Sequence, residues 1–84
     1  MKKVLITGSS TGIGFECAMY FINSGWNVFG HYFEKNKRID EIKNIDGNEC
    51  HYCDFSDDRS FKDFIDKVES VQFDALINNA GYYC

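Results

Sequence analysis

Three glycines and four hydroxyl residues directly follow a short apolar run, and this arrangement could bind an anion. The run is Val4-Leu5-Ile6, and the segment behind it reads Thr7-Gly8-Ser9-Ser10-Thr11-Gly12-Ile13-Gly14. A buried strand that turns sharply into a helix leaves backbone N–H groups unpaired at the positive end of that helix. Such groups form a ready site for phosphate. The sequence therefore predicts that this turn holds the diphosphate of a dinucleotide.

Each glycine of the turn has its own task in this hypothesis. Gly8 permits the tight exit from the strand, Gly12 lets the backbone approach the diphosphate, and Gly14 lets the helix pack closely on the sheet. Ordinary helix packing is the alternative explanation for Gly14. The other predicted cofactor contacts of the turn are Ser9, Ser10, Thr11 and Ile13. The serines and the threonine offer hydroxyl and N–H groups, although isolated residues of this kind are commonly solvated turn positions.

Strand and helix patterns alternate along the whole chain. Strands are predicted at residues 3–7, 26–33, 49–53 and 74–77. Helices are predicted from the glycine turn to about residue 23, from 36 to about 46, and from a Ser56 N-cap through the stripe Phe61, Phe64, Ile65 and Val68. This alternation predicts an α/β fold, a Rossmann-like doubly wound parallel sheet of four strands in the order 3-2-1-4 with three helices. In that order the first and fourth strands are neighbours.

A second motif, Asn78-Asn79-Ala80-Gly81, follows the fourth predicted strand. Together with the glycine turn, which reads TGxxxGIG, it resembles the short-chain dehydrogenase/reductase family, including its 3-oxoacyl-carrier-protein reductases. The family has both motifs in this order and at this distance. The resemblance covers the whole chain but only the first half of such an enzyme. Residues 1–84 are therefore expected to be the N-terminal dinucleotide-binding half of a Rossmann domain.

The resemblance also implies roles for residues at the ends of the third and fourth strands. Asp54 would accept a hydrogen bond from the adenine amino group, with Phe55 beside it. A plain turn aspartate before the next helix is the alternative for Asp54. Asn79 would stabilise the central strands and contact the adenosine half of the cofactor, while Ala80 and Gly81 keep the crevice open.

The choice between NADP and NAD is expected to depend on the end of the second strand. Matching the family's motif places Tyr32 where an acid would bind the ribose 2′-OH of NAD. Since no acid stands there and Lys35, Lys37 and Arg38 follow, NADP is favoured over NAD. Glu34, which lies 20 residues beyond Gly14, is the counter-argument. The lysines could also be an ordinary solvated helix start.

The resemblance implies an NAD(P)-dependent oxidoreductase that transfers hydride between the cofactor and a carbonyl or secondary alcohol. The family's proton donor lies in a Tyr-x-x-x-Lys motif, which this sequence does not contain. No catalytic residue is therefore assigned, and the chain is expected to be inactive alone. A non-catalytic nucleotide-binding module or truncated relic is the second hypothesis. A flavodoxin-like phosphate binder is the third, and the Asn78–Gly81 turn argues against it.

Composition narrows the remaining function classes. A net charge of −4 and a pI near 4.9 argue against nucleic acid as a partner. Because the sequence has no apolar run of about 18 residues and no signal-peptide pattern, a cytoplasmic location without membrane contact is expected. The exposed edge of the fourth strand predicts self-association, or a homo-oligomer in a full-length form.

Four cysteines raise the question of a metal or disulfide. Cys50 and Cys53 have the spacing of a metal knuckle, but on a strand their side chains point to opposite faces. We therefore predict no metal site. Reduced thiols are expected at Cys17, Cys50, Cys53 and Cys84.

Overall fold

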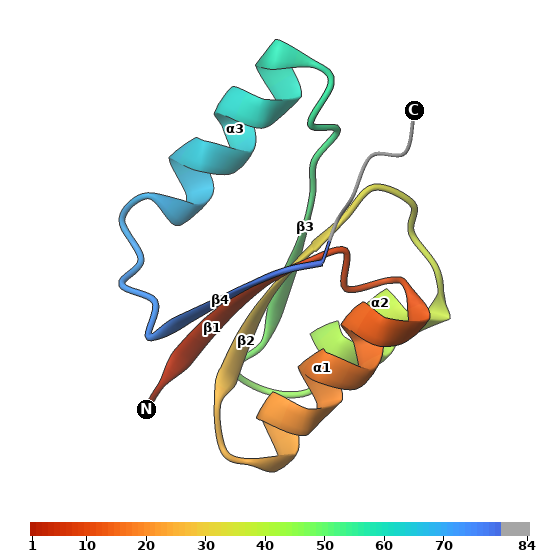
Figure 1. Cartoon of the computed structure of the whole chain (residues 1–84), viewed down its shortest axis with the longest axis vertical. Coiled ribbons are helices and arrows are strands. Elements are labelled where there is room, and N and C mark those ends of the chain that lie inside the picture. The colour runs from red at the N-terminus through yellow and green to blue at the C-terminus, as the bar shows by residue number, and fades with distance from the viewer. Residues whose placement is uncertain (80–84) are drawn as a thin grey trace.

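The computed structural model describes residues 1–79, which form a parallel four-stranded sheet with helices on both faces (Figure 1). The strands are β1 (Lys3–Thr7), β2 (Asn27–Tyr32), β3 (Glu49–Tyr52) and β4 (Ala75–Asn78). The helices are α1 (Gly12–Asn23), α2 (Lys37–Lys43) and α3 (Asp58–Val68). The strand order β3-β2-β1-β4 confirms the predicted Rossmann-like topology.

Two apolar clusters lie on opposite faces of the sheet. Helices α1 and α2 cover one face and α3 covers the other (Figure 1). The larger cluster, under α1 and α2, is made of Val4, Ile6, Ala18, Val28, Ile39, Ile42 and Cys50. The smaller one, under α3, is made of Cys53, Phe64 and Val68, with Leu5, Phe29, Phe55 and Phe73 packed against it. Since strand side chains alternate between faces, β1 is apolar on both sides, as a central parallel strand must be.

Cys50, in β3, and Cys53, directly after it, lie on opposite faces of the sheet. Cys50 belongs to the cluster under α1 and α2, and Cys53 to the cluster under α3. The prediction that they point to opposite faces is confirmed. Burial raises the pKa of the Cys50 thiol to about 11 and also raises the pKa of Cys53. Cys17 is half-buried and, like these two, a free thiol, whereas Cys84 lies outside the described residues.

Helix α3 begins one residue later than predicted. Its N-cap is Asp57, whose carboxylate accepts the backbone N–H of Arg59 at 3.2 Å. The predicted N-cap, Ser56, is wrong because its N–H and hydroxyl both donate to the Asp54 carboxylate, at 3.0 and 2.7 Å. Because the Ser56 hydroxyl is bonded to Asp54, it does not cap the helix. Within the helix, Phe64 and Val68 are buried, but Phe61 and Ile65 are exposed.

The other boundaries differ from the predicted ones by a few residues. Helix α2 ends at Lys43, short of the predicted 46, because the side-chain amide of Asn48 donates to the carbonyls of Ile45 and Asp46 and holds that segment as a turn. Gly47 then takes a φ of +86°, which favours glycine. Strand β2 is one residue shorter at each end, β3 ends at Tyr52, and β4 starts and ends one residue later.

Strand β4 is an edge of the described sheet, paired only with β1 in the order β3-β2-β1-β4. Its Leu76 side chain is 62% exposed. Of the helices in residues 1–79, none has the length and apolar character needed to cross a membrane.

Candidate functional site

The turn between β1 and α1 is built by hydrogen bonds among its own residues. Gly8 has a φ of +69°, a conformation that favours glycine, and this lets the chain leave β1 sharply. Thr11 is the N-cap of α1, and its hydroxyl oxygen accepts the N–H of Gly14 at 3.2 Å. The same hydroxyl donates to the Gly8 carbonyl oxygen at 2.9 Å. The predicted role of Gly8 in the tight exit from the strand is therefore confirmed.

Gly14 and Gly12 lie in opposite surroundings. A Cβ atom on Gly14 would overlap the Gly8 carbonyl oxygen and lie 2.7 Å from the Asn79 amide nitrogen. Gly14 is thus required where α1 packs on the end of the sheet, as predicted. A Cβ atom on Gly12 would meet no heavy atom within 4 Å among the described residues. The backbone of Gly12 therefore faces open space that a ligand could enter.

The first turn of α1 presents unpaired backbone donors. Among residues 1–79, the N–H groups of Ser10, Gly12 and Ile13 have no acceptor. Gly12 and Ile13 are both exposed, and the Ile13 side chain is 71% exposed. These donors lie at the positive end of the helix dipole. The turn can therefore bind an oxyanion, which is the chemistry predicted from the sequence.

Ser9 does not belong to this open surface. Its side chain is completely buried, its hydroxyl donates to the Ile6 carbonyl at 2.8 Å, and its N–H donates to the His31 carbonyl at 2.8 Å. The absence of a side chain at Gly30 makes room for it. The expectation that Ser9 offers its hydroxyl and N–H to a phosphate is corrected by this burial. Ser9 supports the turn from beneath.

Asn79 joins the end of β4 to the glycine turn. Its backbone N–H donates to the Thr7 hydroxyl oxygen at 3.0 Å. Its side-chain amide donates to the Gly8 carbonyl oxygen at 3.2 Å and to the Thr11 hydroxyl oxygen at 2.9 Å. The two motifs that lie far apart in the sequence thus meet at one corner. The predicted contacts of Ala80 and Gly81 lie outside the described residues.

The segment after β2 also docks on the turn. The Ser10 carbonyl oxygen accepts the side-chain amide of Asn36 at 3.0 Å and the guanidinium of Arg38 at 3.3 Å. Arg38 also lies over the ring of Phe15, 5.8 Å from its centroid. A cation is thereby held at the outer side of the turn, whereas the sequence alone shows Arg38 only as one of three basic residues that follow the second strand.

The other residues of that cluster are placed differently. Lys35 forms an exposed ion pair with Asp40 at 3.6 Å. Tyr32 ends β2 opposite Tyr52 of β3, and the two ring centroids are 6.2 Å apart. Tyr32 packs against the cluster under α1 and α2, so its side chain lies on the α2 face of the sheet.

Asp54 and Phe55 follow β3. The Asp54 carboxylate accepts both donors of Ser56, so it forms the turn before α3 that the alternative interpretation expected. Its backbone N–H donates to the Ser60 hydroxyl oxygen at 2.8 Å. Phe55 is half-buried and stacks on the His31 ring, with centroids 4.3 Å apart. Phe55 is therefore linked to the glycine turn through His31, which accepts a hydrogen bond from Gly8.

His31 contacts the glycine turn, although it belongs to none of the motifs in the sequence. It is 2% exposed, accepts the Gly8 N–H at Nδ1 over 3.0 Å, and donates from Nε2 to the Cys53 carbonyl over 2.9 Å. Burial lowers the pKa of its imidazole, so the neutral form is favoured. Only the register of β2 against the turn and β3 reveals this role.

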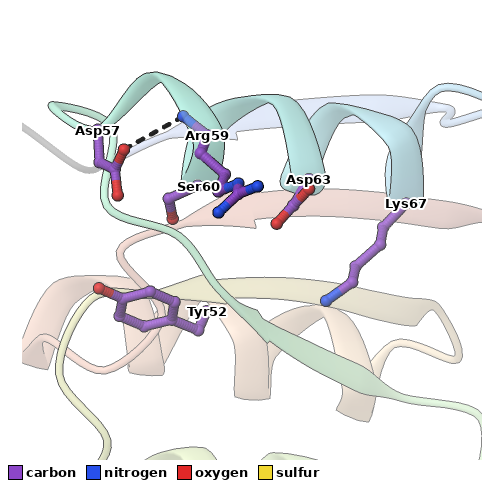
Figure 2. Close-up of a pocket in the computed structure, with 6 residues that line it drawn as sticks. All are labelled: Tyr52, Asp57, Arg59, Ser60, Asp63 and Lys67. Carbon is purple, nitrogen blue, oxygen red and sulfur yellow. Dashed lines mark hydrogen bonds between the residues drawn. The ribbon is translucent and has the colours of Figure 1, made fainter.

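A pocket of about 250 Å³ lies elsewhere, between α3 and the end of β3 (Figure 2). It is lined by Tyr52, Asp57, Arg59, Ser60, Asp63 and Lys67. Its charged side chains have both signs. None of the predicted cofactor-binding residues lines it, so the candidate site remains the glycine turn and the strand ends beside it.

Comparison with known proteins places this geometry in a family. The model of the family described as short chain dehydrogenase matches residues 2–84, which include both the glycine turn and the Asn79 corner. The chain belongs to the short-chain dehydrogenase family. The resemblance predicted from the two motifs is thus confirmed.

Relatives within the short-chain dehydrogenase family cover nearly the whole chain. It is 36% identical to the uncharacterised oxidoreductase YxbG of Bacillus subtilis (strain 168), over 95% of this chain and 32% of that protein. It is 34% identical to the 3-oxoacyl-[acyl-carrier-protein] reductase FabG of Chlamydia pneumoniae, over 95% of this chain and 35% of that protein. The chain thus spans about a third of the length of these relatives.

A solved structure gives the same result for the fold. The 4-hydroxyisoleucine dehydrogenase complexed with NADH superimposes with a TM-score of 0.83 and 25% identity, over 98% of this chain and 35% of that one. This short-chain dehydrogenase chain therefore folds like the corresponding part of a much longer protein.

Proposed function

We propose that this chain is the cofactor-binding half of an oxidoreductase and binds a nicotinamide dinucleotide at the glycine turn. The observation that carries the proposal is the set of N–H groups at Ser10, Gly12 and Ile13 that have no acceptor among residues 1–79. No described atom lies within 4 Å of where a Cβ atom on Gly12 would stand. Diphosphate oxygens are well suited to such donors. A fold neighbour that is complexed with NADH supports the choice of ligand.

The adenosine half would lie over the carboxyl ends of β2 and β3. Asp54 is half-buried at the end of β3, and its carboxylate is already oriented by Ser56. An oriented carboxylate can accept the adenine amino group at little further cost in side-chain entropy. Tyr32 and Phe55 would flank this region on the two faces of the sheet. Asn79 would hold the turn in place from the β4 side.

Arg38 supports a preference for NADP. Its guanidinium is held at the Ser10 carbonyl, next to the turn, whereas Lys35 is paired with Asp40. Tyr32, at the end of β2, offers no carboxylate to repel a 2′-phosphate or to bind a 2′-OH. A planar guanidinium matches phosphate oxygens well. We therefore propose that Arg38 binds the 2′-phosphate of NADP.

The reaction of the whole protein would be hydride transfer between the nicotinamide and a carbonyl or secondary alcohol. The cofactor supplies the hydride, and a proton must reach the carbonyl oxygen from elsewhere. The 84-residue sequence has no Tyr-x-x-x-Lys motif, so we propose that these residues bind cofactor and do not complete turnover alone. A nucleotide-binding module without turnover is the second candidate. A reductase assay on any longer form of the chain distinguishes the two.

Calorimetric titration of the chain with NADP⁺ and NAD⁺ tests the proposed ligand. Binding of both is expected, with NADP⁺ tighter. In Arg38→Ala the affinity for NADP⁺ should fall about tenfold, since a hydrogen bond to a charged group is lost, while the affinity for NAD⁺ changes little.

Lys37→Ala is the matched control, because Lys37 is exposed and adjacent in α2. It should leave both affinities unchanged beyond a small loss of general attraction. Equal losses for NADP⁺ and NAD⁺ in Arg38→Ala would show that Arg38 supports the turn and does not recognise the 2′-phosphate. A folded wild-type chain that binds neither dinucleotide would contradict the proposed function.

A further inference from the structure

His31 lies between two parts of the proposed cofactor site and is bonded to both. Its Nδ1 accepts the N–H of Gly8, at the start of the glycine turn, over 3.0 Å. Its Nε2 donates to the carbonyl of Cys53, directly before Asp54, over 2.9 Å. Its ring also stacks on Phe55, at 4.3 Å between centroids. One imidazole therefore fixes the spacing between the turn and the segment after β3.

The two partners require one neutral form of the ring. Gly8 offers an N–H and Cys53 offers a carbonyl oxygen, so Nδ1 must be without a proton and Nε2 must carry one. A second proton on Nδ1 would face the Gly8 N–H, and one of the two groups would have to move. Protonation of His31 would thus break the hydrogen bond that holds the first residue of the turn.

Within residues 1–79, the hydrogen-bond partners of the ring and the aromatic rings of Phe55 and Phe64 beside it are uncharged. On the turn side the neighbours are Gly8 and Ser9, and on α3 the neighbour is the uncharged Phe64, at 5.5 Å between centroids. The titratable neighbours are His51, Cys53 and Asp54: His51 is the partner of His31 in β3, and the other two follow that strand. Burial lowers the pKa of His31, in agreement with this environment.

We propose that His31 is a positioning residue of the dinucleotide site, which sets the glycine turn relative to Asp54 and Phe55 through its two ring nitrogens. The expected effect of His31 on cofactor affinity rests on the proposed function. The hydrogen bonds of His31 to Gly8 and Cys53 lie within the chain and do not depend on it. The two parts can therefore fail separately.

Two conservative variants separate the two hydrogen bonds. The Oδ1 of His31→Asn can take the place of Nδ1 and accept from Gly8, whereas the amide nitrogen of His31→Gln can take the place of Nε2 and donate to Cys53. Because the turn carries the phosphate donors, His31→Gln should weaken NADP⁺ binding about tenfold and His31→Asn only about threefold. His51→Gln is the control and should leave NADP⁺ affinity unchanged, since His51 bonds Glu49 on the β3 edge strand.

An NMR titration of the wild-type chain measures the coupling without a ligand. On acidification, the Gly8 amide signal should shift with the same midpoint as the His31 ring nitrogens. A Gly8 signal that ignores the titration of His31, or variants at position 31 that fold and bind NADP⁺ like the wild type, would overturn the inference. A wild-type chain that shows the Gly8 coupling but binds neither NADP⁺ nor NAD⁺ would overturn the proposed function and keep the structural role of His31.

Discussion

The side-chain amide of Asn79 donates to the backbone carbonyl of Gly8 over 3.2 Å, although 71 positions separate them in the sequence. The same amide reaches the Thr11 hydroxyl, which is also bonded to Gly8. Three residues from the two motifs thus form one closed set of hydrogen bonds. The shape of the glycine turn therefore depends on correct pairing of β4 with β1.

Removing the Asn79 side chain should loosen this corner. Asn79→Ala deletes two donors and leaves the Gly8 carbonyl and Thr11 hydroxyl with fewer partners, so we expect a loss of about 1 to 3 kcal/mol in the free energy of unfolding. Urea denaturation measures it. Asn44→Ala, at an exposed position after α2, is the control and should cost much less. A loss no larger than that of the control would contradict the bridging role.

The glycines at positions 12 and 14 should respond in opposite ways to alanine. Gly14→Ala places a methyl group on the Gly8 carbonyl oxygen and should cost roughly 3 kcal/mol or more. Gly12→Ala meets open space, and Gly12 does not have a positive φ, so the free energy of unfolding should rise by roughly 0.5 kcal/mol.

NADP⁺ affinity distinguishes Gly12 from a surface position that has no role in binding. The added methyl group of Gly12→Ala would stand where the proposed diphosphate approaches, so NADP⁺ affinity should fall although stability does not. Thermal denaturation and calorimetry on the same preparation give both results. Full NADP⁺ affinity in Gly12→Ala would indicate that the diphosphate lies elsewhere.

Much of the fold could be predicted because local patterns and short connections leave few arrangements open. Four apolar strands separated by helices imply a parallel sheet with right-handed crossovers, and the dinucleotide-binding fold indicated by the glycine turn has the strand order 3-2-1-4. The meeting of the glycine turn with Asn79 follows from that order, since β1 and β4 are neighbours.

Three features of the structure could not be predicted from the sequence because they depend on which residues contact each other in the folded chain. Ser9 and Ser10 are identical in type, yet only the packing of β2 decides that Ser9 is buried over Gly30. The N-cap of α3 is Asp57 and not Ser56 because the Ser56 hydroxyl donates to the Asp54 carboxylate. The role of His31 depends on its register between Gly8 and Cys53. Each requires knowledge of which atoms face each other across strands.

The stability of the chain should fall in acid through His31. Burial lowers the pKa of His31 in the folded chain below the ordinary value of 6.5. At a pH between the folded and unfolded pKa values, the unfolded chain therefore binds more protons than the folded chain. The free energy of unfolding is consequently lost as the pH falls below 6.5. Urea midpoints from about pH 7.5 to about pH 5 measure this slope, to which carboxylates also contribute. The slope should be smaller in His31→Phe, and an identical slope would contradict the neutral, buried state of His31.

The exposed edge strand should promote self-association. Leu76 is 62% exposed on β4, which pairs only with β1 among the described strands. Sedimentation velocity should show oligomers that increase with concentration, and Leu76→Glu should reduce them because charge on an edge strand opposes pairing. Lys62→Glu, on α3, is the control. A wild-type chain that stays monomeric at every concentration would contradict this expectation.

Residue-resolved NMR during titration with NADP⁺ tests the central claim most directly. The account predicts that the largest shifts occur at the amides of Ser10, Gly12 and Ile13, with a smaller effect at the Asn79 side chain. Shifts confined to the α3 pocket around Asp57 and Lys67, or none at the glycine turn when binding is saturated, would contradict it.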